Sequence, residues 1–151
     1  MKKVLIFGVS LILILGVSFL NSCKKEKVQG CMDRDSKNYN PDAEEDDGNC
    51  AFEGNVVLWF NQETADSLID NGVTALTYYV DGAVVGSSAA SVYWTSAPNC
   101  NQSGSVTILR DLGSVKNKSY SYSVKDQAGD EQFSGVLNFT ANTCTATELV
   151  W

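Results

Sequence analysis

The stretch Leu76-Thr-Tyr-Tyr-Val-Asp-Gly-Ala-Val-Val85 sets the architecture of most of this chain. Residues 76, 78 and 80 are apolar or aromatic and alternate with Thr77 and Tyr79, the period-two pattern of a strand that buries one face. Asp81-Gly82 then separates two apolar runs. This dipeptide favours a type I′ turn, in which both central residues have positive φ, so the stretch predicts a β-hairpin.

Similar short patterns fill residues 53–151. Ser119-Tyr-Ser-Tyr-Ser-Val-Lys125 alternates strictly, and Asn55-Val-Val-Leu-Trp-Phe60 is apolar on both faces, which suits a central strand. Gln127-Ala-Gly-Asp130 is expected as a turn. We therefore expect one domain here, an all-β, antiparallel immunoglobulin-like β-sandwich of seven or eight strands. The remaining segments expected as strands are 92–94, 106–108, 136–139 and 145–151.

One short helix is expected after the first of these strands. Thr64 is its predicted N-cap, because small polar side chains accept hydrogen bonds from the first turn. Leu68 and Ile69 are predicted to face the core. Asn71-Gly72 is predicted to end the helix.

Val80-Asp-Gly82, the strand spacing and the late Cys144 give the region a family resemblance. It is similar to small immunoglobulin-like or carboxypeptidase-regulatory-like β-domains of bacterial envelope proteins. The resemblance implies a sandwich fold. It implies no functional residues, because sandwiches host many unrelated functions.

The N-terminal segment has the pattern of a secretion signal. Lys2 and Lys3 precede an apolar run over residues 4–20, and small residues follow. A transmembrane helix is the alternative, because the run is at the lower limit of length for one. Leu20-Asn-Ser-Cys23 resembles the bacterial lipobox. That resemblance implies a signal peptide over 1–22, cleavage before Cys23, and fatty acyl chains such as palmitate on Cys23, which hold the protein at a membrane.

The cysteines fit the same interpretation. The chain has five, at positions 23, 31, 50, 100 and 144, and an odd number in an exported protein needs an explanation. Lipid on Cys23 leaves four for an oxidising compartment. Of the three possible pairings we expect Cys31–Cys50 and Cys100–Cys144. Zinc is the competing use, and the absence of histidine and of Cys-x-x-Cys argues against it.

Residues 31–50 form an acidic module, preceded by a short charged tether over 23–30. Seven carboxylates lie between Cys31 and Cys50, and only Arg34 and Lys37 oppose them. Calcium would offset their repulsion, since it takes carboxylate, amide and backbone oxygens as ligands. A disulfide-closed acidic linker without metal is the alternative. The candidate calcium ligands are Asp33, Asn38, Asn40, Asp46 and Asp47.

The module also resembles a known repeat. Cys31-x-Asp33, Asn38-Tyr-Asn-Pro-x-Ala43 and Asp46-Asp-Gly-x-Cys50 look like a short cysteine-bounded repeat of surface and secreted proteins in Bacteroidetes-type bacteria. They are loosely similar to thrombospondin type-3 calcium repeats as well. The resemblance implies an exported protein and is compatible with calcium.

The net charge and the residue types present argue against two classes of function, nucleic-acid binding and catalysis. The net charge is −7, and removal of residues 1–22 would leave nine basic against 18 acidic residues, a net charge of −9. This disfavours nucleic acid as a partner, since phosphates require Lys and Arg. Without histidine, and with no Gly-x-Ser-x-Gly, we expect no enzyme. A pair of carboxylates from among Asp111, Asp126, Asp130 and Glu131 is the remaining catalytic candidate.

The sequence thus predicts a lipid-anchored, non-enzymatic binding module of the cell envelope. A glycan or another envelope protein is the expected partner, because the domain is rich in tyrosine and tryptophan, which stack on sugars and fill interfaces. Tyr79 and Tyr93 are the aromatic residues expected to be exposed. A structural or accessory lipoprotein without a ligand is the alternative. Lys24 after Cys23 indicates attachment to the outer membrane. The periplasmic and the surface face of that membrane are both alternatives.

Overall fold

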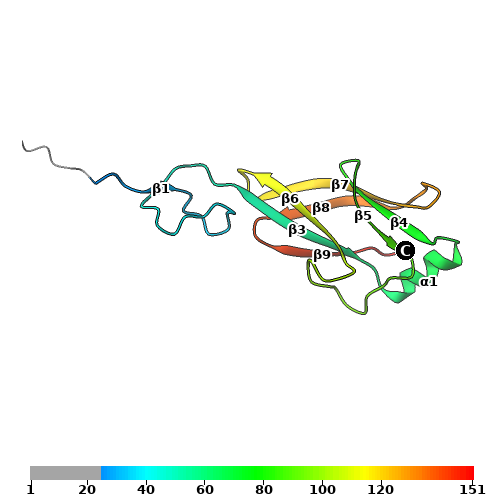
Figure 1. Ribbon diagram of the computed structural model, residues 1–151. Helices are drawn as coiled ribbons and strands as arrows, with labels where there is room; N and C mark the ends of the chain where they lie inside the picture. The colour runs from blue at the N-terminus through cyan, green and yellow to red at the C-terminus, as the bar shows by residue number, and fades with distance from the viewer. Residues whose placement is uncertain (1–24) are drawn as a thin grey trace, which may run out of the picture.

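The structure, a computed structural model, describes residues 25–151 as a small N-terminal module followed by a β-sandwich (Figure 1). The module contains β1 (Gln29–Gly30) and β2 (Glu45–Asp46), which pair in parallel. The sandwich contains β3 (Phe52–Trp59), α1 (Gln62–Asp70), β4 (Ala75–Val80), β5 (Ala83–Ala89), β6 (Val106–Gly113), β7 (Asn117–Asp126), β8 (Glu131–Thr140) and β9 (Cys144–Glu148).

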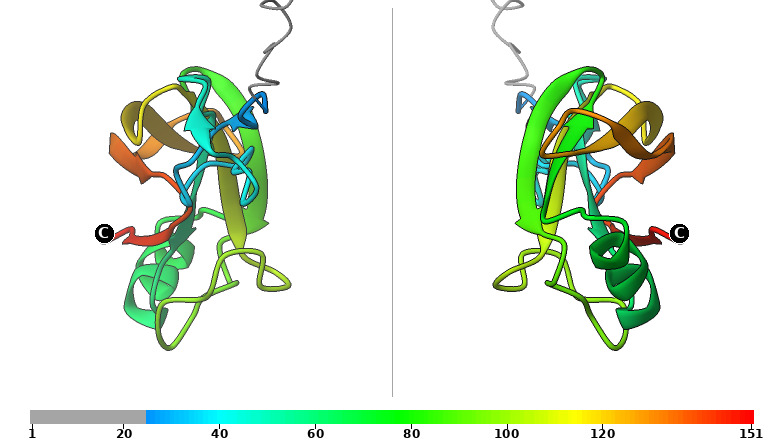
Figure 2. Two further views of the ribbon diagram at one scale, coloured as in Figure 1. Left: turned by 90° about the vertical axis from the view of Figure 1, so that its left-hand side faces the viewer. Right: turned by 90° about the vertical axis from the view of Figure 1, so that its right-hand side faces the viewer.

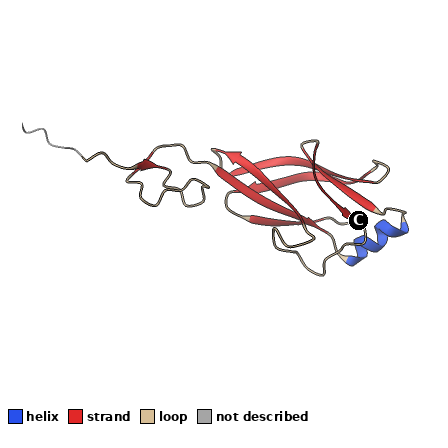
Figure 3. Ribbon diagram, viewed as in Figure 1, coloured by secondary structure: helices blue, strands red, loops and turns tan. Residues whose placement is uncertain are grey.

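The predicted all-β sandwich is confirmed (Figure 3). One sheet has the order β6-β3-β9 and the other β5-β4-β7-β8. Every pairing within these two sheets is antiparallel except that of β3 with β9, which is parallel. In immunoglobulin constant domains the first strand shares a sheet with the second, fourth and fifth. Here β3, the first, joins the fourth and the last, so the likeness is one of layers and strand number.

Strand β3 is buried on both faces, as its apolar sequence predicts. Val56 and Leu58 point into the core between the sheets, and Val57 is equally buried on the outer face of its sheet. Gly54 allows a close approach, because a Cβ there would lie 2.6 Å from the carbonyl oxygen of Thr140 on β8. The rest of the core comes from both sheets and the helix, chiefly Leu68, Leu76, Tyr78, Val80, Ile108, Val124, Leu137 and Phe139.

The local turn chemistry follows the sequence. Asp81 and Gly82 have φ of 49° and 75°, so the β4–β5 connection has the two positive φ angles that a type I′ turn requires. The turn between β7 and β8 falls at residues 127–130, where the Asp126 carboxylate accepts hydrogen bonds from the backbone N–H groups of Ala128 and Asp130. Both hairpin predictions are confirmed.

The helix corrects two predictions. Asn61, not Thr64, is the N-cap, and its side chain accepts a hydrogen bond from the Thr64 N–H at 2.9 Å. Thr64 lies one turn further on and is buried. Leu68 is buried as predicted, but Ile69 is 47% exposed, since the next residue along a helix lies about 100° away from the buried stripe.

Two expected strands also differ from the structure. Residues 92–94 lie in the loop between β5 and β6, where the Trp94 N–H donates to the carbonyl oxygen of Phe60 instead of joining a ladder. The last strand ends at Glu148 instead of reaching residue 151. The aromatic run does not mark a buried strand here, since Val92 and Tyr93 on this loop are each 41% exposed.

Both expected disulfides are present. Cys31 bonds to Cys50 and closes the module, and Cys100 bonds to Cys144 and ties the β5–β6 loop to the start of β9. The expected signal peptide over 1–22 and the lipidated Cys23 lie outside the described residues. Among residues 25–151, no helix has the length and apolar content needed to cross a bilayer.

Replacing Cys100 and Cys144 together by alanine should lower the free energy of unfolding by about 4 kcal/mol, because the bond closes a long loop in the unfolded chain. Denaturant titration followed by tryptophan fluorescence measures this. The matched control is the Cys31→Ala, Cys50→Ala variant, whose short loop lies outside the sandwich. If the control lowers the free energy of unfolding of the sandwich as much as the first variant does, the special role of Cys100–Cys144 in stabilising the sandwich is contradicted.

Candidate functional site

The acidic module and the helix lie at opposite ends of the long axis of the molecule (Figure 1). Figure 2 shows the same arrangement end-on, with the module in front in one view and α1 in front in the other. We call the end that carries α1 and the β5–β6 loop the distal end. It is the end furthest from residue 25, where the described chain begins.

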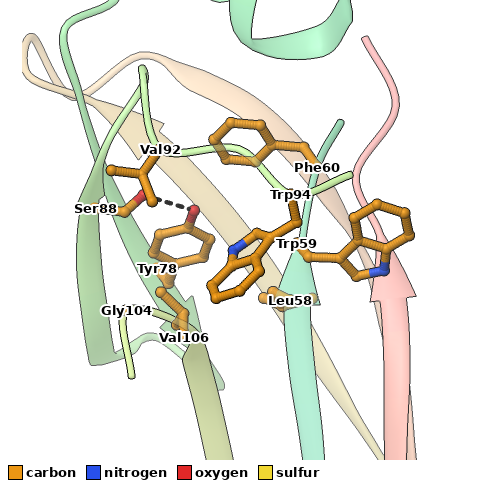
Figure 4. A pocket seen from close by; sticks show the side chains of 9 residues that line it. All are labelled: Leu58, Trp59, Phe60, Tyr78, Ser88, Val92, Trp94, Gly104 and Val106. Carbon is orange, nitrogen blue, oxygen red and sulfur yellow. Dashed lines mark hydrogen bonds between the residues drawn. The ribbon is translucent and has the colours of Figure 1, made fainter. Parts of the chain in front are cut away.

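The distal end carries a small aromatic hollow between the two sheets. Leu58 and Phe60 line it from β3 and its continuation, Tyr78 from β4, and Val92 and Trp94 from the β5–β6 loop. Figure 4 shows the Trp94 indole beside Tyr78 and Leu58, whereas Trp59 points to the β9 side of β3. The space admits no more than about one water molecule. It can therefore seat the edge of a ligand but cannot enclose one.

The polar group in this hollow is held firmly. The Tyr78 hydroxyl shares a hydrogen bond of 3.0 Å with the Ser88 hydroxyl on β5. Burial raises the pKa of Tyr78, so its hydroxyl stays neutral at all physiological pH values. The hollow therefore offers an apolar and uncharged surface.

The β5–β6 loop is fixed to the sandwich at several points. The Trp94 N–H donates a hydrogen bond to the carbonyl oxygen of Phe60, and the Asn101 N–H donates one to the Thr107 hydroxyl at 2.8 Å. A disulfide joins Cys100 to Cys144. Gly104, with φ of 88°, turns the chain against the Trp94 indole. A loop anchored in this way presents its side chains with little loss of entropy on binding.

Several aromatic and apolar side chains are exposed or half-buried around this loop. Val92 and Tyr93 are each 41% exposed, and Trp59 and Trp94 are half-buried. We name these four residues the distal aromatic surface. Tyr93 is exposed as the sequence predicts. Tyr79 is half-buried on the outer face of the other sheet, where the Lys125 ammonium lies 5.5 Å from its ring centroid.

The acidic module separates the five candidate calcium ligands. Asp33 is engaged by the sandwich, since Lys116 Nζ lies 2.8 Å from its carboxylate and 2.9 Å from that of Asp35. Lys116 thus places positive charge beside two of the seven carboxylates of the module. Sequence reasoning missed this pairing because the two partners are 83 residues apart.

The other four candidate ligands are used within the module. The Asn38 amide oxygen accepts from the Ala51 N–H, and the side chains of Asn40, Asp46 and Asp47 each accept from the backbone N–H two residues further on. Such short-range bonds shape turns. Between residues 25 and 151, no three Asp, Glu, Cys or His side chains come close enough together to hold a metal ion.

Calcium binding by the module stays a prediction, and calorimetry tests it. Titration of the full-length protein with millimolar calcium should release heat if the module rearranges to free its carboxylates. The Asp46→Asn, Asp47→Asn variant should abolish that heat, and Asp130→Asn, in the β7–β8 turn, is the matched control. Heat that survives in the Asp46→Asn, Asp47→Asn variant would contradict a site in the module.

Three ion pairs hold the module against the sandwich. Besides the two made by Lys116, Lys37 of the module lies 2.6 Å from the Asp111 carboxylate on β6. The hydrogen bond from Lys116 holds the pKa of Asp33 below its ordinary value, and that from Lys37 does the same for the pKa of Asp111. The pKa values of both lysines are raised by the same bonds. The pairs are solvent-exposed, so salt weakens them.

The docking of the module should therefore depend on pH and salt. Because the folded pKa values of both carboxyls are depressed, the attraction is fully present above about pH 4 and is lost as the pH falls through the lowered values. Amide ¹⁵N relaxation should show the module tumbling with the sandwich at pH 7, and independently once the pH has fallen through the lowered pKa values of Asp33 and Asp111 or in about 1 M NaCl.

The Lys37→Gln, Lys116→Gln variant should show independent tumbling at pH 7, whereas Lys125→Gln, a lysine outside the module contact, should not. Joint tumbling of the double variant at pH 7 would show that contacts other than these ion pairs hold the module.

Of the four catalytic carboxylate candidates, only Asp126 and Asp130 share hydrogen bonds, and these bonds shape the β7–β8 turn. Asp111 is paired with Lys37, and Asp126 accepts hydrogen bonds that shape the β7–β8 turn and one from the Gln132 side chain. Asp130 and Glu131 are exposed in the same turn and at the start of β8. Asp111 and Asp126 thus make structural contacts. The candidate functional site is the distal aromatic surface.

Comparison with known proteins adds no family to this description, since no protein-family model, curated protein or solved structure matches the chain.

Proposed function

We propose that this protein is a lipid-anchored, non-enzymatic interaction module of the bacterial cell envelope, which binds an envelope protein or glycan through its distal aromatic surface. The observation that carries the proposal is the separation of the two ends (Figure 1). A membrane anchor on Cys23 would attach the protein at the module end, so the distal aromatic surface would face away from the bilayer.

The make-up of that surface supports a binding role. Aromatic side chains bring a large apolar area and lose little entropy, and they pack on sugar rings or into protein interfaces. Tyr93 and Trp94 stand on a loop that is fixed by a disulfide and by hydrogen bonds to Phe60 and Thr107. The small size of the hollow fits a flat contact better than a small-molecule pocket.

Lipid attachment is tested by metabolic labelling with a palmitate analogue in the producing bacterium. The Cys23→Ala variant should lose the label and leave the membrane fraction, because the acyl chains are the attachment. The Ser22→Ala variant keeps a small residue before the cleavage point and should stay labelled. A label that persists in the Cys23→Ala chain would overturn the anchor.

Partner binding is tested with a photoreactive phenylalanine analogue in the native envelope. Placed at Tyr93, it should give discrete crosslinked species that mass spectrometry identifies, because this side chain would lie in the interface. The control position is Val136, which is 63% exposed on the outer face of β8, away from the distal end. Equal crosslinking at both positions, or none at Tyr93, would favour a structural or accessory lipoprotein instead.

A further inference from the structure

Two basic side chains meet at one tyrosine ring at the end of the sandwich nearest the module. The Arg110 guanidinium carbon lies 5.7 Å, and the Lys118 ammonium 5.1 Å, from the centroid of the Tyr120 ring. That ring packs edge-on against Phe139 at 5.4 Å, and its hydroxyl donates to the carbonyl oxygen of Asp111. Tyr120 is thereby fixed, and both cations lie beside this one ring.

Arg110 has few partners of its own. It is half-buried on β6, between the buried Ile108 and Leu112. Its Nη2 donates to the carbonyl oxygen of Val80 at 3.3 Å. A guanidinium has five N–H donors, and no acceptor in residues 25–151 receives the others. Nε is fully buried without a partner, so the charge is partly removed from water.

The nearest carboxylates in the chain are turned elsewhere. Asp111 follows Arg110 on β6 but pairs with Lys37 of the module. Asp81 follows Val80 but accepts a hydrogen bond from the Ser121 hydroxyl on the outer face of the sheet. Within the described residues, neither Arg110 nor Lys118 has a carboxylate within 4.0 Å.

In a chain of net charge −7, Arg110 and Lys118 have no carboxylate within 4.0 Å, whereas Lys37 and Lys116 do. The half-buried guanidinium offers a fork of N–H donors and the exposed ammonium a point charge, and each of these groups binds the oxygens of carboxylates and phosphates. From this juxtaposition we propose that Arg110 and Lys118 bind an oxyanion-bearing ligand, through its phosphate or carboxylate group, against Tyr120.

This site is separate from the distal aromatic surface and does not rest on the proposed function. Arg110 precedes Asp111, which meets Lys37 of the module, and Lys118 is the second residue of β7, whereas the Trp94 N–H donates to Phe60, beyond the other end of β3. A failure of one proposal therefore leaves the other intact.

The chain is well suited to a direct test, because it contains two arginines, Arg34 and Arg110. In a ¹⁵N-labelled sample the arginine Nε–H groups give one cross-peak each, so the exposed Arg34 is an internal control. Titration with inorganic phosphate, and separately with glucuronate, should shift the Arg110 peak saturably and leave the Arg34 peak in place. Whichever anion binds more tightly identifies the ligand as a phosphate or as an acidic sugar.

Variants separate binding from structure. Lys118→Gln removes one charge of the site without touching the bond to Val80, so it should weaken anion binding by roughly fivefold or more at unchanged melting temperature. Lys125→Gln is the matched control, because Lys125 also lies over a tyrosine ring but has no arginine beside it.

Three results would overturn the proposal. They are no saturable shift with either anion, equal shifts of both arginine peaks, or an affinity that Lys118→Gln leaves at the wild-type value.

Discussion

Strand β3 is buried on both faces, at Val56, Val57 and Leu58. The packing of the other strands depends on this double burial. Strand β3 begins two residues after Cys50 of the module and ends next to Phe60, whose carbonyl oxygen accepts a hydrogen bond from the Trp94 N–H. It pairs with β6 on one side and β9 on the other, and Gly54 lets β8 pass close above it. A rigid central strand thus sets the distance between the module and the distal aromatic surface.

Ion pairs join the acidic module to the sandwich. Lys116 of the sandwich pairs with Asp33 and Asp35 of the module, and Asp111 of the sandwich pairs with Lys37, so opposite charges meet across the junction. Such exposed pairs add little stability one by one, but three together fix an orientation. Arg110 and Lys118 stand outside this exchange, although Lys118 contributes to lowering the pKa of Asp111.

Local patterns made the architecture predictable, whereas the sites depend on contacts between distant segments. Alternation in residues 119–125 and the Asp-Gly pair at 81–82 act through near neighbours, so they identify β7 and the β4–β5 hairpin correctly. Residues 92–94 are as apolar as a strand, yet they close a hollow from a loop. The allocation of β3 to a sheet with β6 and β9 has no local signal. Nor does the proximity of Lys116 to Asp33, one of the predicted calcium ligands.

The parallel pairing of β3 with β9 has a consequence for the order of folding. Asn55 lies opposite Cys144, so the first and last strands of the sandwich meet across a separation of 89 residues. Contacts of such long range form slowly, because a large loop must close before they are gained. During synthesis from the N-terminus, the three-stranded sheet therefore stays incomplete until the last strand emerges. We expect Cys31–Cys50 to form early and Cys100–Cys144 last, as the step that closes the domain.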